Sequence, residues 1–245
     1  GLKLGQPRIE GLRIVFESPP IWSLYSGKGQ RVFSIFNQFP ERSHSFSLPS
    51  DITHPEIHFS PEFKRPFDPF CGPALELLTV EQLAAGSGCL LHGCGIQLSN
   101  SGILFAGQSG AGKSTMLKLW AEETDALILS DDRAIAQYSG DELRIYGTPW
   151  HGKTRGGLPD SAKLEGIFFL GHGRSNGIRR LSNAEVVRKL LTCSFPPLWD
   201  AAGMSATLDF FNSVSQEIPC YELAFVPDDS IVKFVRQWSN GLSDA

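Results

Sequence analysis

The first part of the chain shows short runs in which apolar and polar residues alternate, separated by residues that favour turns. A period of two is typical of strands that bury one face. It predicts strands at 12–17, 32–36 and 56–59, and the four prolines within 59–73 predict an extended segment after them. We interpret residues 1–72 as a small β-rich N-terminal subdomain.

From residue 73 onwards the pattern changes to longer elements. Apolar residues at helical spacing predict helices at 73–85, 114–121, 181–193, 200–216 and 229–238. Apolar runs predict strands at 89–98, 103–106, 126–130, 166–170 and 221–226, with a hairpin at 134–138 and 143–146. The strand at 89–98 is expected to be broken by its small residues. Ser182 and Glu185 have the spacing of a helix capping box. Together these elements predict an α/β domain over residues 73–245.

Residues 107–115 of this domain match the phosphate-binding pattern of nucleotide-using proteins, G-x-x-x-x-G-K-[ST], and we call this segment the phosphate-binding loop. It lies between a predicted strand and a predicted helix, where glycines bring backbone amides close to an anion and the helix adds its positive end. Lys113 is expected to meet the β- and γ-phosphates of ATP, and the Ser114 hydroxyl to bind Mg²⁺. The predicted nucleotide-binding residues are Gly107, Gln108, Ser109, Gly110, Ala111, Gly112, Lys113, Ser114 and Thr115.

Two adjacent carboxylates, Asp131 and Asp132, follow the strand predicted after the loop helix. They lie 18 and 19 residues past Lys113, which leaves room for one helix and one strand and places them near the phosphates. One carboxylate can hold Mg²⁺, and the other can accept the proton of an attacking hydroxyl. Both reach the site only if the strand ends there, because neighbouring strand residues point to opposite faces. An Asp-Asp pair also suits a helix cap or a surface turn, and this alternative stays open.

Composition narrows the classes of protein. The net charge of −4 offers no general basic surface for nucleic acid, so no nucleic-acid partner is expected. No apolar run reaches the roughly 18 residues of a membrane span, and there is no signal-peptide pattern, so we expect a cytoplasmic protein without a membrane partner. Five scattered cysteines indicate reduced, mostly buried thiols. Homo-oligomerisation stays open.

The string His92-Gly93, the phosphate-binding loop and the string Ser130-Asp131-Asp132-Arg133 together resemble HPr kinase/phosphorylase, the kinase of the phosphocarrier protein of bacterial sugar transport. The resemblance covers residues 75 to about 150 and implies a P-loop kinase core of the phosphoenolpyruvate carboxykinase-like fold. It also implies that His92 lies near the phosphates, that Asp131 is the catalytic base and that Asp132 helps to hold the metal. Taken alone, a buried His92 would more often be a core residue.

The chain departs from that kinase at two places. The family's E-[IL]-R-G strand is replaced by Arg-Ile-Tyr-Gly at 144–147, and the large separate N-terminal domain is absent or much shortened. With these two departures the chain resembles smaller relatives of HPr kinase/phosphorylase that are found with peptide- and natural-product-modifying genes, such as lasso-peptide precursor kinases and SynChlorMet cassette proteins. The glycine-rich loop 147–157 offers His151, Lys153 and Arg155 for the transfer step, with a solvated basic loop as the alternative. The remaining histidines, His172 among them, are too scattered to be named as ligands.

These features predict an enzyme, a kinase that uses ATP and Mg²⁺ to phosphorylate a Ser or Thr hydroxyl of a peptide or small protein. The expected catalytic residues are Lys113, Asp131, His92 and His151, and the expected metal ligands are Ser114 and Asp132. A small-molecule kinase with the same machinery is one alternative, and a nucleotide-dependent assembly or switch protein with slow hydrolysis is another. The N-terminal subdomain and the loop 147–157 are expected to flank the open side of the phosphate site.

Overall fold

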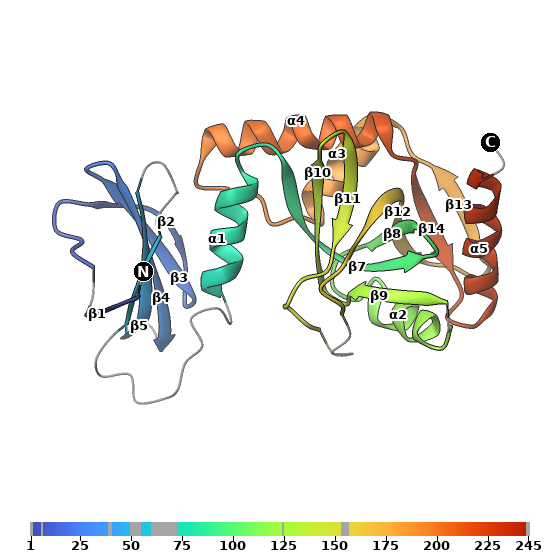
Figure 1. The fold of residues 1–245 in the computed structure, drawn as a ribbon, viewed down its shortest axis with the longest axis horizontal. Helices are drawn as coiled ribbons and strands as arrows, with labels where there is room; N and C mark the ends of the chain where they lie inside the picture. The colour runs from blue at the N-terminus through green and yellow to red at the C-terminus, as the bar shows by residue number, and fades with distance from the viewer. Residues whose placement is uncertain are drawn as a thin grey trace. The chain divides into compact units, whose positions relative to one another are not determined.

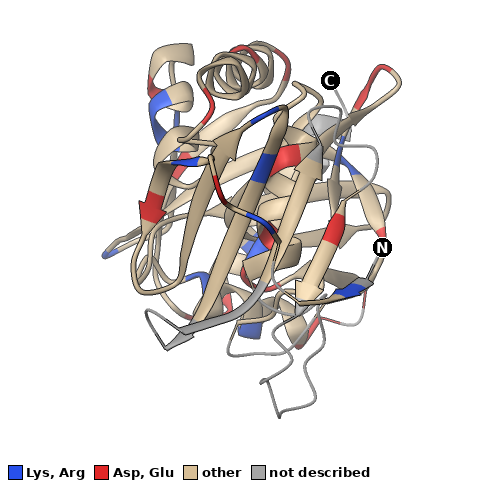
Figure 2. Cartoon of the chain, turned by 90° about the vertical axis from the view of Figure 1, so that its left-hand side faces the viewer, with Lys and Arg blue, Asp and Glu red and all other residues tan. Residues whose placement is uncertain are grey.

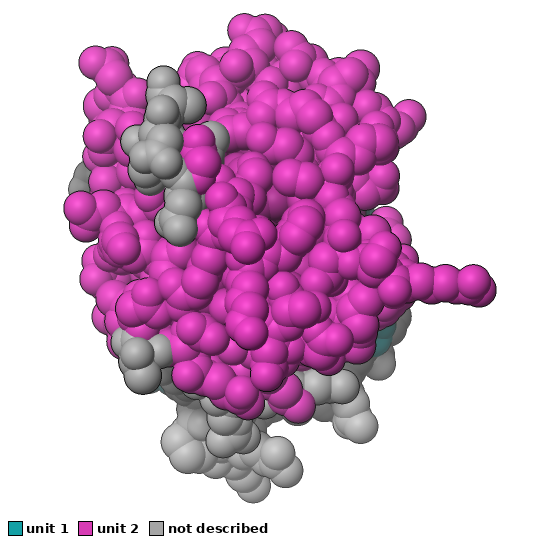
Figure 3. All heavy atoms as spheres, turned by 90° about the vertical axis from the view of Figure 1, so that its right-hand side faces the viewer, with its two compact units in different colours: residues 1–82, 198–200 teal, residues 83–197, 201–245 magenta. Residues whose placement is uncertain are grey.

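The computed structural model describes residues 2–5, 7–38, 41–49, 55–59, 73–123, 125–152 and 157–243. Contacts within the chain divide it into two compact units, which carry different colours in Figure 3. The first unit holds residues 1–82 and 198–200, and the second holds residues 83–197 and 201–245. Each unit has a sheet and a core of its own, so the chain has a mixed α/β fold with two sheets (Figure 1).

A six-stranded sheet forms most of the first unit, in the strand order β1-β6-β5-β4-β3-β2. Neighbouring strands are antiparallel except β1 and β6, which are parallel. The strands are β1 (Leu2–Leu4), β2 (Arg13–Ser18), β3 (Trp22–Gly27), β4 (Gln30–Gln38), β5 (Glu41–Pro49) and β6 (Glu56–Phe59). Strands β2, β4 and β6 correspond to the three strands that were predicted, whereas β1, β3 and β5 were not predicted.

The core of the first unit is built from the sheet and from helix α1 (Pro73–Leu83). Its buried members are Trp22, Leu24, Phe33, Ile35, Phe46, Leu48, Ile57, Ala74 and Leu77. Since α1 supplies two of these side chains, the first unit extends through Gln82, near the end of the helix, whereas we placed the division after residue 72. Most of the predicted extended segment, residues 60–72, lies outside the described residues.

A buried carboxylate fastens α1 to this core. Glu81 is only 2% exposed, lies 2.5 Å from the Arg31 guanidinium and accepts a hydrogen bond from Trp199 Nε1 at 2.5 Å. Burial raises the pKa of Glu81, while the Trp199 hydrogen bond and the Arg31 charge act in the opposite direction. The Trp199 ring also meets the rings of Trp22 and Phe33 edge-on. The segment 198–200 is therefore an integral part of the first unit.

The sheet of the second unit has the order β11-β10-β7-β8-β12-β14-β13, with β9 paired to β7. Strand β11 also pairs with β12, so the pairings of β7, β8, β12, β11 and β10 close into a ring. The pairs β8–β12 and β12–β14 are parallel, and the others are antiparallel. The strands are β7 (Gly88–Leu98), β8 (Ser101–Ala106), β9 (Ala126–Ser130), β10 (Arg133–Ser139), β11 (Glu142–Tyr146), β12 (Ser161–His172), β13 (Gly177–Arg180) and β14 (Cys220–Phe225).

Helices cover both faces of this sheet (Figure 1). They are α2 (Lys113–Ala121), α3 (Asn183–Thr192), α4 (Ala201–Glu217) and α5 (Ser230–Ser243). Successive residues of β8 point to opposite faces: Ile103 and Phe105 pack with α2 and α5, whereas Leu104 and Ala106 pack with α3 and α4. The central strands are apolar on both faces because each face is buried under helices.

Two predictions from local sequence patterns in the second unit, a capping box and a broken strand, have different outcomes. The capping box of α3 is present, with the Glu185 carboxylate accepting hydrogen bonds from the Ser182 amide at 2.9 Å and hydroxyl at 2.8 Å. The predicted break in the strand at 89–98 is wrong, because β7 is continuous. Its glycines instead give neighbouring side chains room: a Cβ on Gly93 would lie 2.7 Å from Leu104 Cδ1.

Charged residues of both signs are interspersed over the described strands and helices (Figure 2). Among the described residues, no helix is long and apolar enough to cross a membrane. The described cysteines are buried free thiols: Cys89, Cys94, Cys193 and Cys220.

Candidate functional site

The predicted strand–loop–helix frame is confirmed, because the phosphate-binding loop connects the end of β8 to the start of α2. Gly112 precedes the helix with a φ of +99°, in the left-handed region that favours glycine. A Cβ at this position would also lie 2.6 Å from the ring of Phe225. The glycine therefore lets the chain turn tightly into α2, so that the positive end of the helix faces the loop.

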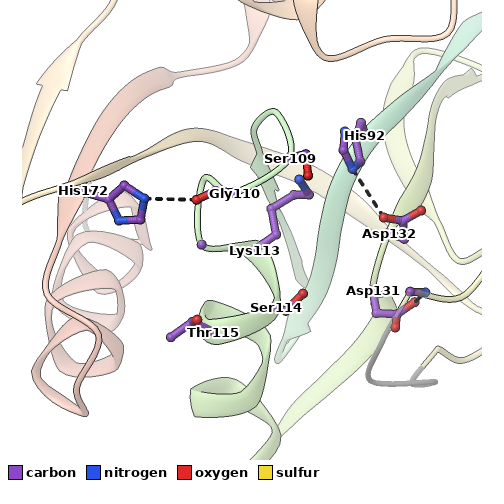
Figure 4. Close-up of a pocket in the computed structure, with 11 residues that line it drawn as sticks. His92, Ser109, Gly110, Lys113, Ser114, Thr115, Asp131, Asp132 and His172 are labelled. Atoms are coloured by element: carbon purple, nitrogen blue, oxygen red, sulfur yellow. Dashed lines mark hydrogen bonds and ion pairs between the residues drawn. The ribbon is translucent and has the colours of Figure 1, made fainter.

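A pocket of about 380 Å³ opens over this loop (Figure 4). Its volume falls in the range of small-molecule sites. It is lined by His92, Ser109, Gly110, Gly112, Lys113, Ser114, Thr115, Asp131, Asp132, Gly152 and His172. Gly107, Gln108 and Ala111 were predicted to bind nucleotide but are not among the lining residues. The pocket therefore brings together five segments that are separate in the sequence.

Lys113 is held by its own loop. The side chain donates hydrogen bonds from Nζ to the carbonyl oxygens of Gly107 at 2.7 Å and Gln108 at 2.9 Å, and the residue is only 7% exposed. Burial lowers the pKa of the amine, while the negative charge of Asp132 acts in the opposite direction. The position of this cation is thus set by the backbone of the loop. Gly107 and Gln108, which do not line the pocket, contribute through these carbonyl groups.

The acidic pair lies directly after β9, where the strand ends, as predicted. The Ser130 hydroxyl donates to the Arg133 carbonyl oxygen across the pair, and the Gly93 amide donates to the Asp132 carbonyl oxygen at 3.0 Å. Because the alternation of the strand stops at this turn, both Asp131 and Asp132 border the pocket. A helix cap is excluded as the role of this pair, since β10 follows it.

Asp132 is the more open carboxylate, with 25% of its side chain exposed. Its Oδ1 lies 3.3 Å from Nε2 of His92 (Figure 4). Its Oδ2 pairs with the Arg133 guanidinium. Burial lowers the pKa of His92, as does the charge of Lys113, whereas Asp132 raises it. The carbonyl oxygen of His92 accepts a hydrogen bond from the Gly107 amide at 3.3 Å. The histidine thus lies between the loop and the acidic pair.

Asp131 is covered by His151 and Gly152 of the loop 147–157. None of its side chain is exposed, and only 4% of the whole residue is. Its Oδ1 accepts a hydrogen bond from the Gly152 amide at 2.8 Å and lies 3.7 Å from Nδ1 of His151, whose side chain is 39% exposed. This part of the loop therefore lies against the acidic pair. Lys153 and Arg155, which were proposed for the transfer step, lie outside the described residues.

His172 also lines the pocket, although no local sequence pattern distinguishes it from the other histidines. Its Nε2 lies 3.0 Å from the carbonyl oxygen of Gly110, and it is the last residue of β12. Strand β12 is parallel to β8, and ligands of α/β sheets bind beyond the carboxyl ends of parallel strands. That rule is the signal that would have pointed to His172, but it requires the strand order, which local sequence patterns do not provide.

Ser114 and Asp132 are the residues that would hold Mg²⁺. Both line the pocket, and hydroxyl and carboxylate oxygens are ligands that this ion prefers, with phosphate and water oxygens completing its shell. In the part of the chain that the structure describes, no group of three or more His, Cys, Asp or Glu side chains is placed to hold a metal ion. The donors present therefore fit an ion that is shared with a phosphate ligand.

No protein-family model and no curated protein match the chain. Among solved structures, the chain is similar to the HPr(Ser) kinase/phosphatase from Coxiella burnetii, with 11% sequence identity and a TM-score of 0.33. The match covers 63% of this chain and 94% of that chain.

Proposed function

We propose that the protein is a kinase that uses ATP and Mg²⁺ to phosphorylate a Ser or Thr hydroxyl of a peptide or small protein. The observation that carries the proposal is that a phosphate-binding loop with its lysine and two carboxylates line one pocket of about 380 Å³. Phosphoryl transfer needs donors that stabilise charge on the phosphates, a metal ligand and a group that accepts the proton of the nucleophile. All three kinds of group are present within this pocket.

The two carboxylates have surroundings that suit different roles. Asp132 is partly open to the pocket that Ser114 also lines, so the two are assigned to Mg²⁺, which would neutralise charge on the phosphates. Asp131 is assigned to accept the proton from the acceptor hydroxyl. The acceptor oxygen then bonds to the γ-phosphorus, the bond from that phosphorus to the β–γ bridging oxygen breaks, and ADP leaves. Lys113 and the loop amides stabilise the charge on the transferred group.

His151 and Gly152 cover Asp131, and we call these two residues the cover. The Asp131 side chain is fully buried, and one of its oxygens accepts a hydrogen bond from the Gly152 amide. The segment that contains His151 and Gly152 must therefore move before the base can act. If the acceptor drives this movement, the base is exposed only when a hydroxyl is present, and transfer to water is suppressed.

The cover over Asp131 also favours a second candidate function. If the loop does not move, ATP is bound beside a base that cannot reach a nucleophile, and the protein is a nucleotide-dependent switch with slow hydrolysis. A small-molecule kinase would use the same groups as the peptide kinase. The preference for a peptide or small protein rests on the sequence resemblance to small relatives of HPr kinase/phosphorylase.

Labelled ATP separates these functions. The protein would be incubated with Mg²⁺, ATP labelled at the γ-phosphorus and a randomised library of Ser- and Thr-containing peptides, with the Lys113→Ala variant as the control. Label on peptide supports the proposal, label on a solute after addition of a cell extract supports a small-molecule kinase, and label only in inorganic phosphate supports the switch. An absence of ATP binding by calorimetry would overturn all three.

A further inference from the structure

His172 reaches the phosphate-binding loop because β12 extends beyond the end of its neighbour β8. The last residue pair between the two strands joins Ala106 of β8 to Phe169 of β12. Beyond that pair the chain of β8 turns into the loop, whereas β12 continues beside β14, where His172 pairs with Phe225. The strand thus carries an imidazole past the end of β8 to the tip of the loop.

The imidazole is fixed to the tip but remains open to the pocket. Its Nε2 lies 3.0 Å from the Gly110 carbonyl oxygen, so Nε2 carries the hydrogen and donates it. The side chain is exposed, and a Cβ placed on Gly110 would meet nothing within 4 Å. The ring therefore has one edge on the loop and a face that a ligand can contact.

The residues after His172 keep it in place. The amide of Gly173 donates to the Phe225 carbonyl oxygen at 3.1 Å. Asn176 accepts a hydrogen bond from the Val226 amide at 2.8 Å and donates one to the Ser230 hydroxyl at 2.7 Å. A side chain that is held before the ligand arrives loses less conformational freedom on binding.

The pocket has two chemically different ends. Asp131 and Asp132 lie on one side of the loop, and His172 lies on the other side, with Lys113 between them (Figure 4). If the reaction occurs at the acidic end, the γ-phosphate lies there and the rest of the nucleotide extends away from it. The loop amides occupy the middle, where the phosphates bind. The nucleoside of the bound nucleotide then lies on the side of His172.

We infer that His172 marks the nucleoside end of the site and contacts the ribose or the base of the bound nucleotide. This inference rests on the proposed function, because the direction of the nucleotide follows from the roles assigned to the acidic pair. The flat ring can stack on a base, and Nδ1 is left to accept a hydrogen bond from a ribose hydroxyl. A competing role for His172 is to position the loop through Gly110 without touching the ligand.

Two ligands distinguish these roles: Mg-ATP, and inorganic tripolyphosphate with Mg²⁺, which has the phosphates but no nucleoside. We expect His172→Ala to weaken the binding of ATP by about tenfold, as stacking contacts do, and to leave the binding of tripolyphosphate unchanged. His172→Gln retains a donor for the Gly110 carbonyl oxygen but lacks the ring, so it should behave like His172→Ala. Isothermal calorimetry measures both affinities, and Arg179→Ala, an exposed residue outside the pocket, is the control.

Each other result overturns the inference. Equal losses for both ligands in His172→Ala, with recovery in His172→Gln, assign the histidine to loop positioning alone. Unchanged affinity for both ligands removes any role in binding. If Lys113→Ala loses both ligands while the His172 variants lose neither, the proposed function stands and the nucleoside end lies elsewhere. If the unaltered protein binds neither ligand, this inference and the proposed function fall together.

Discussion

The carboxylate of Asp131 accepts a hydrogen bond from the backbone amide of Gly152, with Oδ1 2.8 Å from the amide nitrogen. The two residues belong to different turns, one after β9 and one after β11, so the contact joins the acidic pair to the loop 147–157. Because the Asp131 side chain is fully buried, a substrate hydroxyl reaches the carboxylate only if this cover moves. Binding of an acceptor and movement of the loop are therefore coupled in the proposed mechanism.

The first prediction concerns the loop cation. Lys113→Ala removes a charged donor from the pocket, and we expect the affinity for Mg-ATP to fall by about 10- to 100-fold, the usual effect of losing a charge-assisted hydrogen bond. Ser114→Ala should weaken binding only when Mg²⁺ is present. Lys118→Ala, on the exposed side of the same helix, is the matched control. Unchanged affinity in calorimetry for both loop variants would remove the nucleotide site from this loop.

The second prediction separates the two carboxylates. Asp131→Asn should bind ATP normally and turn over about 10²- to 10⁴-fold more slowly, the range expected for the loss of a general base. Asp132→Asn should act by weakening Mg²⁺, so that higher Mg²⁺ concentrations restore its activity. Steady-state rates measured over a series of Mg²⁺ concentrations test both. Rescue of Asp131→Asn instead of Asp132→Asn would exchange the two roles.

The third prediction concerns the cover over the base. His151→Ala removes a ring that lies 3.7 Å from Asp131, and we expect nucleotide affinity to stay the same while transfer to an acceptor falls about tenfold. The fraction of ATP that is lost to water should rise, because the loop excludes solvent less well. Glu142→Ala in β11 is the control. Normal transfer and normal hydrolysis in His151→Ala would show that the cover plays no part in the reaction.

A fourth prediction concerns the stability of the first unit. Glu81→Ala leaves the Arg31 guanidinium and the Trp199 indole without their common acceptor, and we expect a loss of about 3–5 kcal/mol in the free energy of unfolding. Urea denaturation followed by tryptophan fluorescence measures this loss. The double variant with Arg31→Ala should be less destabilised than the sum of the single variants. Additive losses would mean that the pair does not act as a unit.

A fifth prediction concerns the start of α3. Hydrogen bonds from the Ser182 amide and hydroxyl, and then from Arg179, lower the pKa of Glu185 from 4.5 to about 2. A carboxylate with a depressed pKa stabilises the folded state above its unfolded pKa, and this contribution is lost as the pH falls from about 4.5 to about 2. Glu185→Gln should remove that part of the acid sensitivity. An NMR titration of Glu185 with a midpoint near 4.5 would contradict this prediction.

Local patterns in the sequence identified the parts of the molecule that local chemistry determines. The phosphate-binding loop, the end of β9 at Ser130 and the capping box at Ser182 each depend on residues within one short segment. Strand β7 was expected to be interrupted because glycine weakens strands in general. In the folded sheet, Gly93 instead leaves space in which the side chain of Leu104 packs. Tertiary packing therefore reversed a local preference at this position.

The features that were missed depend on contacts between distant parts of the chain. Strands β3 and β5 contain several serines, and some of them, such as Ser23 and Ser45, are buried. Polar residues at buried positions weaken the alternation of apolar and polar residues by which a strand is recognised in the sequence. The role of His172 requires the knowledge that β12 lies beside β8. Trp199 belongs to a core whose other members precede it by more than a hundred residues. Each case is decided by strand order or by long-range packing.

The position of Trp199 has a consequence for how this chain can be divided. The chain passes from one unit to the other after Gln82, after Pro197 and after Asp200. A cut after residue 82 would deprive Glu81 of its indole donor and leave Trp199 on a fragment that lacks its aromatic neighbours. The N-terminal unit is therefore not a cassette that one recombination event can exchange. We expect the two units to be inherited together, with the tryptophan and its carboxylate acceptor changing in concert.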